Sequence, residues 1–239
     1  MKNRIETTSA SLHIMAMAFM LCDHLWATVV PGNEWLTCVG RLAFPIFAFL
    51  IVEGYFHTSD LKKYALRLLV FAALSEIPFN LAAGGSVLYP FHQNVLWTFL
   101  ISLGLIHWNE SVKRHGRAVR MTVACVSVLL GSVAGLVAFA DYLHGGVLTV
   151  LVFYFFRARN WVSRFCQLIG LAWINLELLG GLVYEFTVIT FPQQGFALLA
   201  LIPIWLYRGN PGLRSPVLKW INYLFYPVHL LILGLLMLL

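Results

Sequence analysis

The sequence predicts an all-α protein that crosses a membrane several times as a bundle of transmembrane helices. Hydrophobic residues occupy 60% of the 239 positions, charged residues occupy 11%, and the mean hydropathy is +0.82. A soluble domain carries about 25% charged residues. Apolar stretches of about 20 residues, the length with which a helix crosses the bilayer core, recur along the whole chain. Residues 1–239 are therefore predicted to form one integral-membrane domain.

Glycine, proline and polar residues divide this apolar sequence into about nine predicted spans. The spans are 12–30, 36–56, 64–83, 93–108, 121–140, 145–156, 161–180, 195–207 and 217–239. The sixth and the eighth are short for a span, so a count of eight or ten also fits the sequence.

The basic residues test this arrangement independently of hydropathy. All but one of the 16 Lys and Arg residues fall within 2–4, 62–67, 113–120, 157–164 and 208–219, at the N-terminus or around even-numbered loops. Cytoplasmic loops of membrane proteins gather Lys and Arg. The N-terminus is therefore predicted to be cytoplasmic. The net charge of +6 follows from topology alone, so no nucleic-acid partner is predicted.

Three ionisable residues lie where the predicted spans should be apolar. Asp23 and His24 interrupt the first span, in LCDHLW, and Arg41 lies a few residues into the second. An ionised group at the bilayer centre costs about 2.5–3.5 kcal/mol even on the lenient insertion scale, so such residues usually face the bundle interior. His24 should lie about 9 Å from the outer end of its helix, at a depth similar to that of Arg41. The structural alternatives are a charge-compensated packing cluster and, for the arginine, snorkelling to the interface.

The last predicted span contains a second polar stripe, in KWINYLFYPVHLL. Asn222, Tyr226 and His229 share one helix face through their i, i+4, i+7 spacing, and Pro227 removes a backbone donor beside them. His229 is expected in the outer half of the membrane with His24. For Asn222 and Tyr226, hydrogen bonding between helices is an explanation equal in weight to contact with a substrate.

Two more polar residues are candidates. Glu76 lies inside the third predicted span, and Asn94 opens the fourth, where a helix cap is the ordinary role for asparagine. The four cysteines show no metal-ligand spacing, so no metal site is predicted.

The chain resembles the TraX family in six motifs that follow one another in order. They are DH, GRLAFPIFAF, SEIPFN, HQNVLWTFLISLGL, DYLHGGVLTVL and YLFYPVHLLIL. The family is named for a conjugative-pilus protein that N-acetylates pilin, and it is similar to multi-pass acyltransferases that modify surface carbohydrates. The resemblance implies a bacterial cytoplasmic membrane, and it points to Asp23, His24, Gly40, Arg41, Pro45, Asn94, Tyr142, Gly146, Tyr226 and His229.

Residues and resemblance together lead to a hypothesis of acetyl transfer from acetyl-CoA, as co-substrate, to an amine or hydroxyl on the extracytoplasmic side. The acceptor would be a pilin N-terminus or a surface carbohydrate. His24 is the expected base, oriented or charge-tuned by Asp23. Arg41 would stabilise the oxyanion or hold a CoA phosphate. His229 would carry a second proton or take the acetyl group covalently.

The remaining candidates are expected to contact acetyl-CoA or the acceptor. They are Asn94, Tyr142, Tyr226, Asn222 and Glu76. A proton- or anion-coupled transporter would use the same buried His, Asp and Arg residues, although the sequence has no inverted repeat to support it. A structural membrane partner held together by these polar contacts is the third interpretation.

Overall fold

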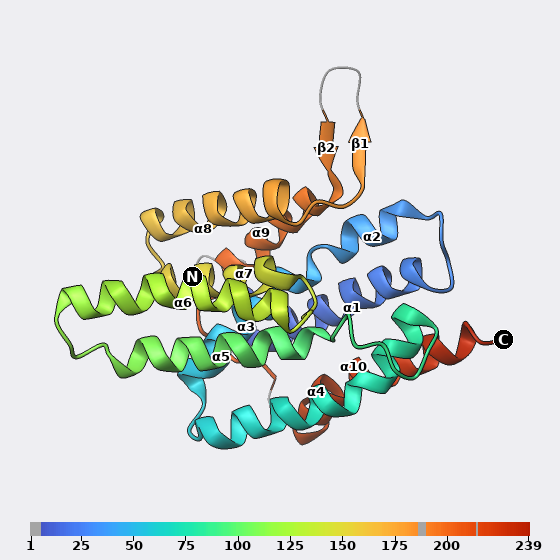
Figure 1. The fold of residues 1–239 in the computed structure, drawn as a ribbon, viewed down its shortest axis with the longest axis horizontal. Coiled ribbons are helices and arrows are strands. Elements are labelled where there is room, and N and C mark those ends of the chain that lie inside the picture. Colours follow the sequence, from blue (N-terminus) through green and yellow to red (C-terminus); the bar gives the residue numbers. More distant parts are fainter. Residues whose placement is uncertain (1–5, 186–189, 214) are drawn as a thin grey trace, which may run out of the picture.

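The computed structural model describes residues 6–185, 190–213 and 215–239, and these residues are predominantly helical (Figure 1). The first five helices are α1 (Ser9–Ala27), α2 (Glu34–Gly40), α3 (Ala43–His57), α4 (Leu61–Gly84) and α5 (Val95–Ser111). They are followed by α6 (Arg117–Val137), α7 (Leu143–Phe155), α8 (Trp161–Trp173), the π-helical turn η1 (Ile174–Leu178), the 3-10 helix η2 (Gln193–Ala200), α9 (Leu201–Leu206) and α10 (Pro216–Leu236). Two short strands, β1 (Val183–Glu185) and β2 (Thr190–Pro192), pair in an antiparallel hairpin.

The prediction of a helical membrane protein is confirmed, but the count of nine spans is not supported. In the part of the chain that the structure describes, five helical segments are long and apolar enough to cross a membrane: Ser9–Ala27, Glu34–His57, Leu61–Gly84, Arg117–Val137 and Val217–Leu236. The predicted span 145–156 forms the 13-residue α7, and the span 195–207 forms η2 and the six-residue α9. Hydropathy records how apolar a segment is, and an apolar helix of this length also serves as the core of a bundle.

The second predicted span is interrupted in the structure. Helix α2 ends at Gly40, α3 begins at Ala43, and Arg41 lies at the break between them. Pro45 is in the first turn of α3, where a backbone N–H has no helical partner and proline is tolerated. The break therefore places Arg41 at a helix end, with its side chain free to turn toward α1.

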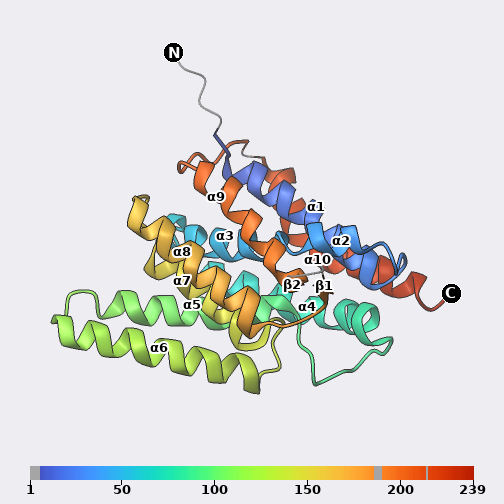
Figure 2. The ribbon, with the colours of Figure 1, turned by 90° about the horizontal axis from the view of Figure 1, so that it is seen from above.

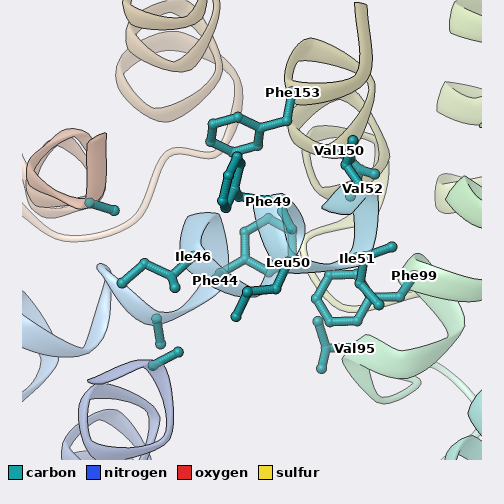
Figure 3. Packing of buried hydrophobic residues seen from close by; sticks show 14 of the residues in the cluster. Phe44, Ile46, Phe49, Leu50, Ile51, Val52, Val95, Phe99, Val150 and Phe153 are labelled. Carbon is teal, nitrogen blue, oxygen red and sulfur yellow. The ribbon is translucent and has the colours of Figure 1, made fainter. Parts of the chain in front are cut away.

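Helix α3 forms the centre of the hydrophobic core (Figure 3). Phe49 packs edge-on against Phe153 of α7, with ring centroids 5.7 Å apart, and Phe44 stacks against Phe99 of α5 at 5.8 Å. Helix α6, in contrast, exposes Leu129, Val133 and Val137. Removing an aromatic residue from such a core typically costs about 3–5 kcal/mol. The bundle is therefore anchored on α3, while α6 presents an apolar face suited to lipid.

Helices α1 and α10 run in the same direction, although they are the first and last helices of the chain. The backbone N–H of Ser9 at the start of α1 donates to the carbonyl of Asn210, just before α10, over 2.9 Å. Figures 1 and 2 show α1, α4 and α10 together on one side of the bundle, and α5 with α6 and α7 on another. The C-terminal halves of α1 and α10 consequently lie side by side, and each contains a histidine.

Candidate functional site

The two histidines predicted to matter in the first and last helices are in direct contact. Nδ1 of His24 lies 2.7 Å from Nε2 of His229, although the residues are 205 positions apart in the sequence. The two rings stack with centroids 5.0 Å apart. His229 also approaches the backbone of its own helix, since its Nδ1 lies 2.5 Å from the carbonyl oxygen of Phe225.

These contacts determine where the protons sit in the neutral pair. The carbonyl oxygen of Phe225 can only accept a hydrogen bond, so Nδ1 of His229 must carry a proton. Its Nε2 is then an acceptor, and Nδ1 of His24 must donate to it. The remaining nitrogen, Nε2 of His24, then carries a lone pair, and the one side-chain hydrogen bond of His24 within the described residues is that of Nδ1 to His229. His24 is therefore oriented by His229 and keeps one basic nitrogen free.

Asp23 pairs with Arg41, which links α1 to the break between α2 and α3. The guanidinium donates to Oδ1 of Asp23, and the same oxygen accepts a hydrogen bond of 2.7 Å from the hydroxyl of Thr37. Both charged side chains are largely buried. The expectation that Asp23 compensates a neighbouring charge matches this geometry, whereas the contact that orients His24 comes from His229.

Gly40 permits this ion pair because it lets α2 approach α1 closely. A Cβ atom built at Gly40 would lie 2.9 Å from the Cα of Asp23, closer than real Cβ atoms come to backbone. Any side chain at this position would push the two helices apart. Gly40 thus sets the separation over which Arg41 reaches Asp23.

A cavity of about 390 Å³, which we call the chamber, opens beside these groups. Its walls include Asp23, His24, Arg41, Phe44, His92, Asp141, Tyr142, His144 and Tyr226. His229 is not part of this lining, and it orients His24 through the hydrogen bond between the two rings. The ring of Tyr226 lies 6.3 Å from that of His24, centroid to centroid. The structure therefore brings His24, Asp23, Arg41, Tyr142 and Tyr226 around one space, as the sequence led us to expect.

Asp141 pairs with His92 in the chamber wall, and Asp141 was not among the residues singled out from the sequence. Nε2 of His92 lies 3.3 Å from Oδ1 of Asp141, and this hydrogen bond raises the pKa of His92, which is in the loop before α5. The loop containing Asp141 is strained, because Phe139, Tyr142 and Leu143 all have positive φ angles. The position of Asp141 next to Tyr142 in DYLHGG was the available clue.

Glu76 and Asn94 lie outside the chamber lining and connect α4 to α5. Asn94 caps α5 by accepting from the N–H of Leu96, and it donates to the carbonyl of Ala72 and to Glu76. Glu76 also accepts a hydrogen bond of 2.9 Å from the indole of Trp97. These contacts agree with the helix-cap interpretation of Asn94, and a role in binding substrate stays a prediction for both residues.

The remaining candidate, Asn222, lines a different cavity, between α1, α4 and α10. Within residues 6–185, 190–213 and 215–239, no group of three or more His, Cys, Asp or Glu side chains has a metal-binding arrangement.

The fold and the chamber together define a class: a helical integral-membrane protein in which ionisable side chains from separate helices converge on a buried polar site. Within this class the chain belongs to the TraX family, because the family model described as TraX protein matches residues 8–237.

Two relatives extend this match across nearly the whole chain. The probable fimbrial assembly protein FimC, serogroup H1, of Dichelobacter nodosus is 28% identical over 251 residues, which cover 98% of this chain and 97% of the relative. Protein TraX of Escherichia coli is 26% identical over 234 residues, which cover 93% of this chain and 84% of the relative. No solved structure matches the chain.

Proposed function

We propose that the protein is a membrane-embedded acetyltransferase that moves an acetyl group from acetyl-CoA to an amine or hydroxyl acceptor on the extracytoplasmic side. The observation that carries this proposal is the side chain of His24, which lines the chamber together with Asp23 and Arg41. Its Nδ1 is hydrogen-bonded to His229, so its Nε2 is the nitrogen left with a lone pair. A general base with an orienting partner and a nearby cation is the set of groups that acyl transfer requires.

In the proposed reaction the acceptor nitrogen attacks the thioester carbonyl carbon, and His24 Nε2 removes the proton that the nitrogen gives up. The new C–N bond forms, and the C–S bond breaks with its electron pair remaining on sulfur. The protonated His24 then returns that proton to the thiolate, so acetyl-CoA and an amine become an amide and CoA thiol. Arg41 stabilises the negative charge that develops on the carbonyl oxygen, in a site where low dielectric strengthens the effect.

The hydrogen-bond pattern also bears on a covalent route. Both ring nitrogens of His229 are engaged, one with Phe225 and one with His24. A covalent route would pass through an acetyl-imidazole intermediate. The nitrogen that carries the acetyl group in it is then Nε2 of His24, and not a nitrogen of His229, which was the expectation from the sequence.

The family supports a pilus-related acceptor, such as a pilin N-terminus, with a surface carbohydrate as the alternative. One relative is named as a probable fimbrial assembly protein, which fits the same setting. We place the protein in a bacterial cytoplasmic membrane with its N-terminus inside, because Lys and Arg concentrate at the N-terminus and around the loops on that side.

The test is CoA thiol release by the purified protein in lipid nanodiscs, with acetyl-CoA and a peptide that has a free N-terminal amine. His24→Ala should lower kcat by about 100-fold or more, the usual contribution of a general base. His115→Ala is the matched control, because this histidine lies exposed in the loop between α5 and α6. An N-terminally blocked peptide should show no acetylation.

Three results would separate the alternatives. Proton or anion movement in liposomes without acetyl-CoA turnover would replace the enzyme with a transporter. The cluster would have a purely structural role if the wild type showed no turnover and none of the three alanine variants folded. These variants are His24→Ala, Arg41→Ala and His229→Ala. A hydroxylamine-sensitive acetyl label on wild-type protein, absent from His24→Ala, would establish the covalent route.

A further inference from the structure

A second and larger cavity, of about 720 Å³, lies between α1, α4 and α10, and we call it the α1–α10 cavity. Its walls are mainly apolar, with Met17, Leu50, Leu68 and Leu218 among the lining residues. Along α1 it extends from Ser9 to Met20, which corresponds to about 16 Å at the rise of an α-helix. The cavity is therefore long and suited to an extended, slim molecule.

The far end of this cavity meets the chamber. Met20, Phe47, Val95, Phe99 and Tyr226 line both spaces. Tyr226 is buried, and its ring is close to that of His24. A molecule that lies along the α1–α10 cavity can therefore present its end to the free nitrogen of His24.

The near end of the cavity is positively charged. Lys219 lines it, and Nε of Arg67 donates to the hydroxyl of Tyr223, another lining residue, over 3.2 Å. These cations belong to the basic groups 62–67 and 208–219 that we assign to the cytoplasmic side. They suit the anionic head of a ligand that enters from the cytoplasm.

One polar group in the wall is left without a partner. The side-chain oxygen Oδ1 of Asn222 is buried and has no hydrogen-bond partner among the described residues, although Asn222 lines the cavity. Leaving such a group unpaired is unfavourable, so a ligand that supplies an N–H donor at this depth would be stabilised. A lipid acyl chain is apolar along its length and supplies no such donor.

We propose that the α1–α10 cavity holds the pantetheine arm of the acyl-CoA donor. The diphosphate lies near Lys219 and Arg67, an amide N–H of the arm donates to Oδ1 of Asn222, and the thioester passes Tyr226 to reach His24. This inference rests on the proposed function, since it names the route by which the donor reaches the same site.

The experiment measures equilibrium binding of radiolabelled acetyl-CoA to the full-length protein in nanodiscs. Ala10 lines the cavity, whereas Ala18, on the same helix, is exposed on the outside of the bundle. Ala10→Trp fills the cavity and should weaken acetyl-CoA binding by about tenfold or more, whereas Ala18→Trp should bind as the wild type does.

A second variant keeps the test independent of any folding defect in Ala10→Trp. Asn222→Leu removes the acceptor without adding bulk and should weaken binding by about three- to tenfold, the size of one hydrogen bond. His24→Ala should retain binding while losing turnover, because it alters the chemistry at the far end.

The outcomes distinguish the two proposals. If the wild type binds acetyl-CoA and both Ala10→Trp and Asn222→Leu bind it equally well, the donor lies elsewhere and only this inference fails. If acetyl-CoA does not bind to the wild type, the proposed function fails and takes the inference with it. Loss of a co-purified phospholipid from Ala10→Trp, with acetyl-CoA binding unchanged, would identify the cavity as a lipid site and overturn the inference.

Discussion

At the scale of single residues, the chamber depends on hydrogen bonds whose direction is fixed by chemistry. The carbonyl of Phe225 determines the tautomer of His229, and His229 in turn determines that of His24. A histidine in an apolar helix is ambiguous by itself, because it serves equally well as a packed core residue. The hydrogen bonds between Phe225 and His229 and between His229 and His24 leave one nitrogen of His24 with a lone pair, which a packing role does not require.

The pairing of His92 with Asp141 predicts a pH-dependent stability. The hydrogen bond to Asp141 raises the pKa of His92 in the folded state. The pair therefore stabilises the protein fully at a pH below about 6.5, the pKa of histidine in the unfolded chain. This stabilisation is lost as the pH rises through the raised pKa of His92 in the folded state. Asp141→Asn should lower the free energy of unfolding more at about pH 5.5 than at about pH 8.5, by at most about 1 kcal/mol because the pair is partly exposed.

Thermal unfolding in detergent micelles at the two pH values measures this difference. His92→Gln is the control. In that background, Asp141→Asn should change the free energy of unfolding by the same amount at both pH values. An equal effect of Asp141→Asn at both pH values in the wild-type background would contradict the pairing.

At the scale of elements, the site depends on one helix break and one close crossing. The break at Arg41 turns a guanidinium toward α1, and Gly40 brings α2 near enough for Arg41 to reach Asp23. Neither feature has a hydropathy signature, because glycine and a single arginine hardly alter the mean over a span of about 20 residues.

Gly40→Ala should therefore destabilise the protein and disrupt the chamber. The added methyl group forces α1 and α2 apart, which we expect to lower the free energy of unfolding by about 1–3 kcal/mol and to reduce the acetyl transfer that we propose. Gly104→Ala is the matched control, since no atom lies within 4 Å of a Cβ at this exposed position of α5. It should stabilise the protein by about 0.5–1 kcal/mol through helix propensity. Thermal unfolding and CoA release are measured for both variants. Equal effects of Gly40→Ala and Gly104→Ala would show that the close approach of α1 and α2 does not depend on Gly40.

At the scale of the whole molecule, two cavities meet near Tyr226 and extend toward opposite ends of α1. One is apolar with basic residues near its entrance, and the other contains His24, Asp23 and Arg41. In the reaction we propose, this arrangement would let the donor and the acceptor approach from different sides of the membrane.

The orientation can be tested by thiol labelling in a cysteine-free background. Leu88, in the loop between α4 and α5, is strongly exposed, and Arg114 is exposed in the loop between α5 and α6. Leu88→Cys should react with a membrane-impermeant maleimide in spheroplasts, whereas Arg114→Cys should react only after permeabilisation. The reverse pattern would invert the topology and place the chamber on the cytoplasmic side.

The helical membrane class could be read from the sequence, because composition and segment hydropathy are local properties that sum along the chain. The sequence also marked His24, Asp23, Arg41 and His229 as candidates, because ionisable groups are costly in lipid and therefore stand out. Its count of nine spans is not supported, because the hydropathy of an apolar segment such as 145–156 is the same whether lipid or protein surrounds that segment.

Which of these groups are in contact became visible in the folded arrangement of the helices. The contact between His24 and His229 depends on α1 and α10 running in parallel side by side, and the Asp141–His92 pair depends on a strained loop folding back over α5. Such contacts follow from the packing of whole helices, with α10 against α4 and α1, and α1 in turn against α3. Packing is a property of many residues at once, so no short stretch of sequence records it.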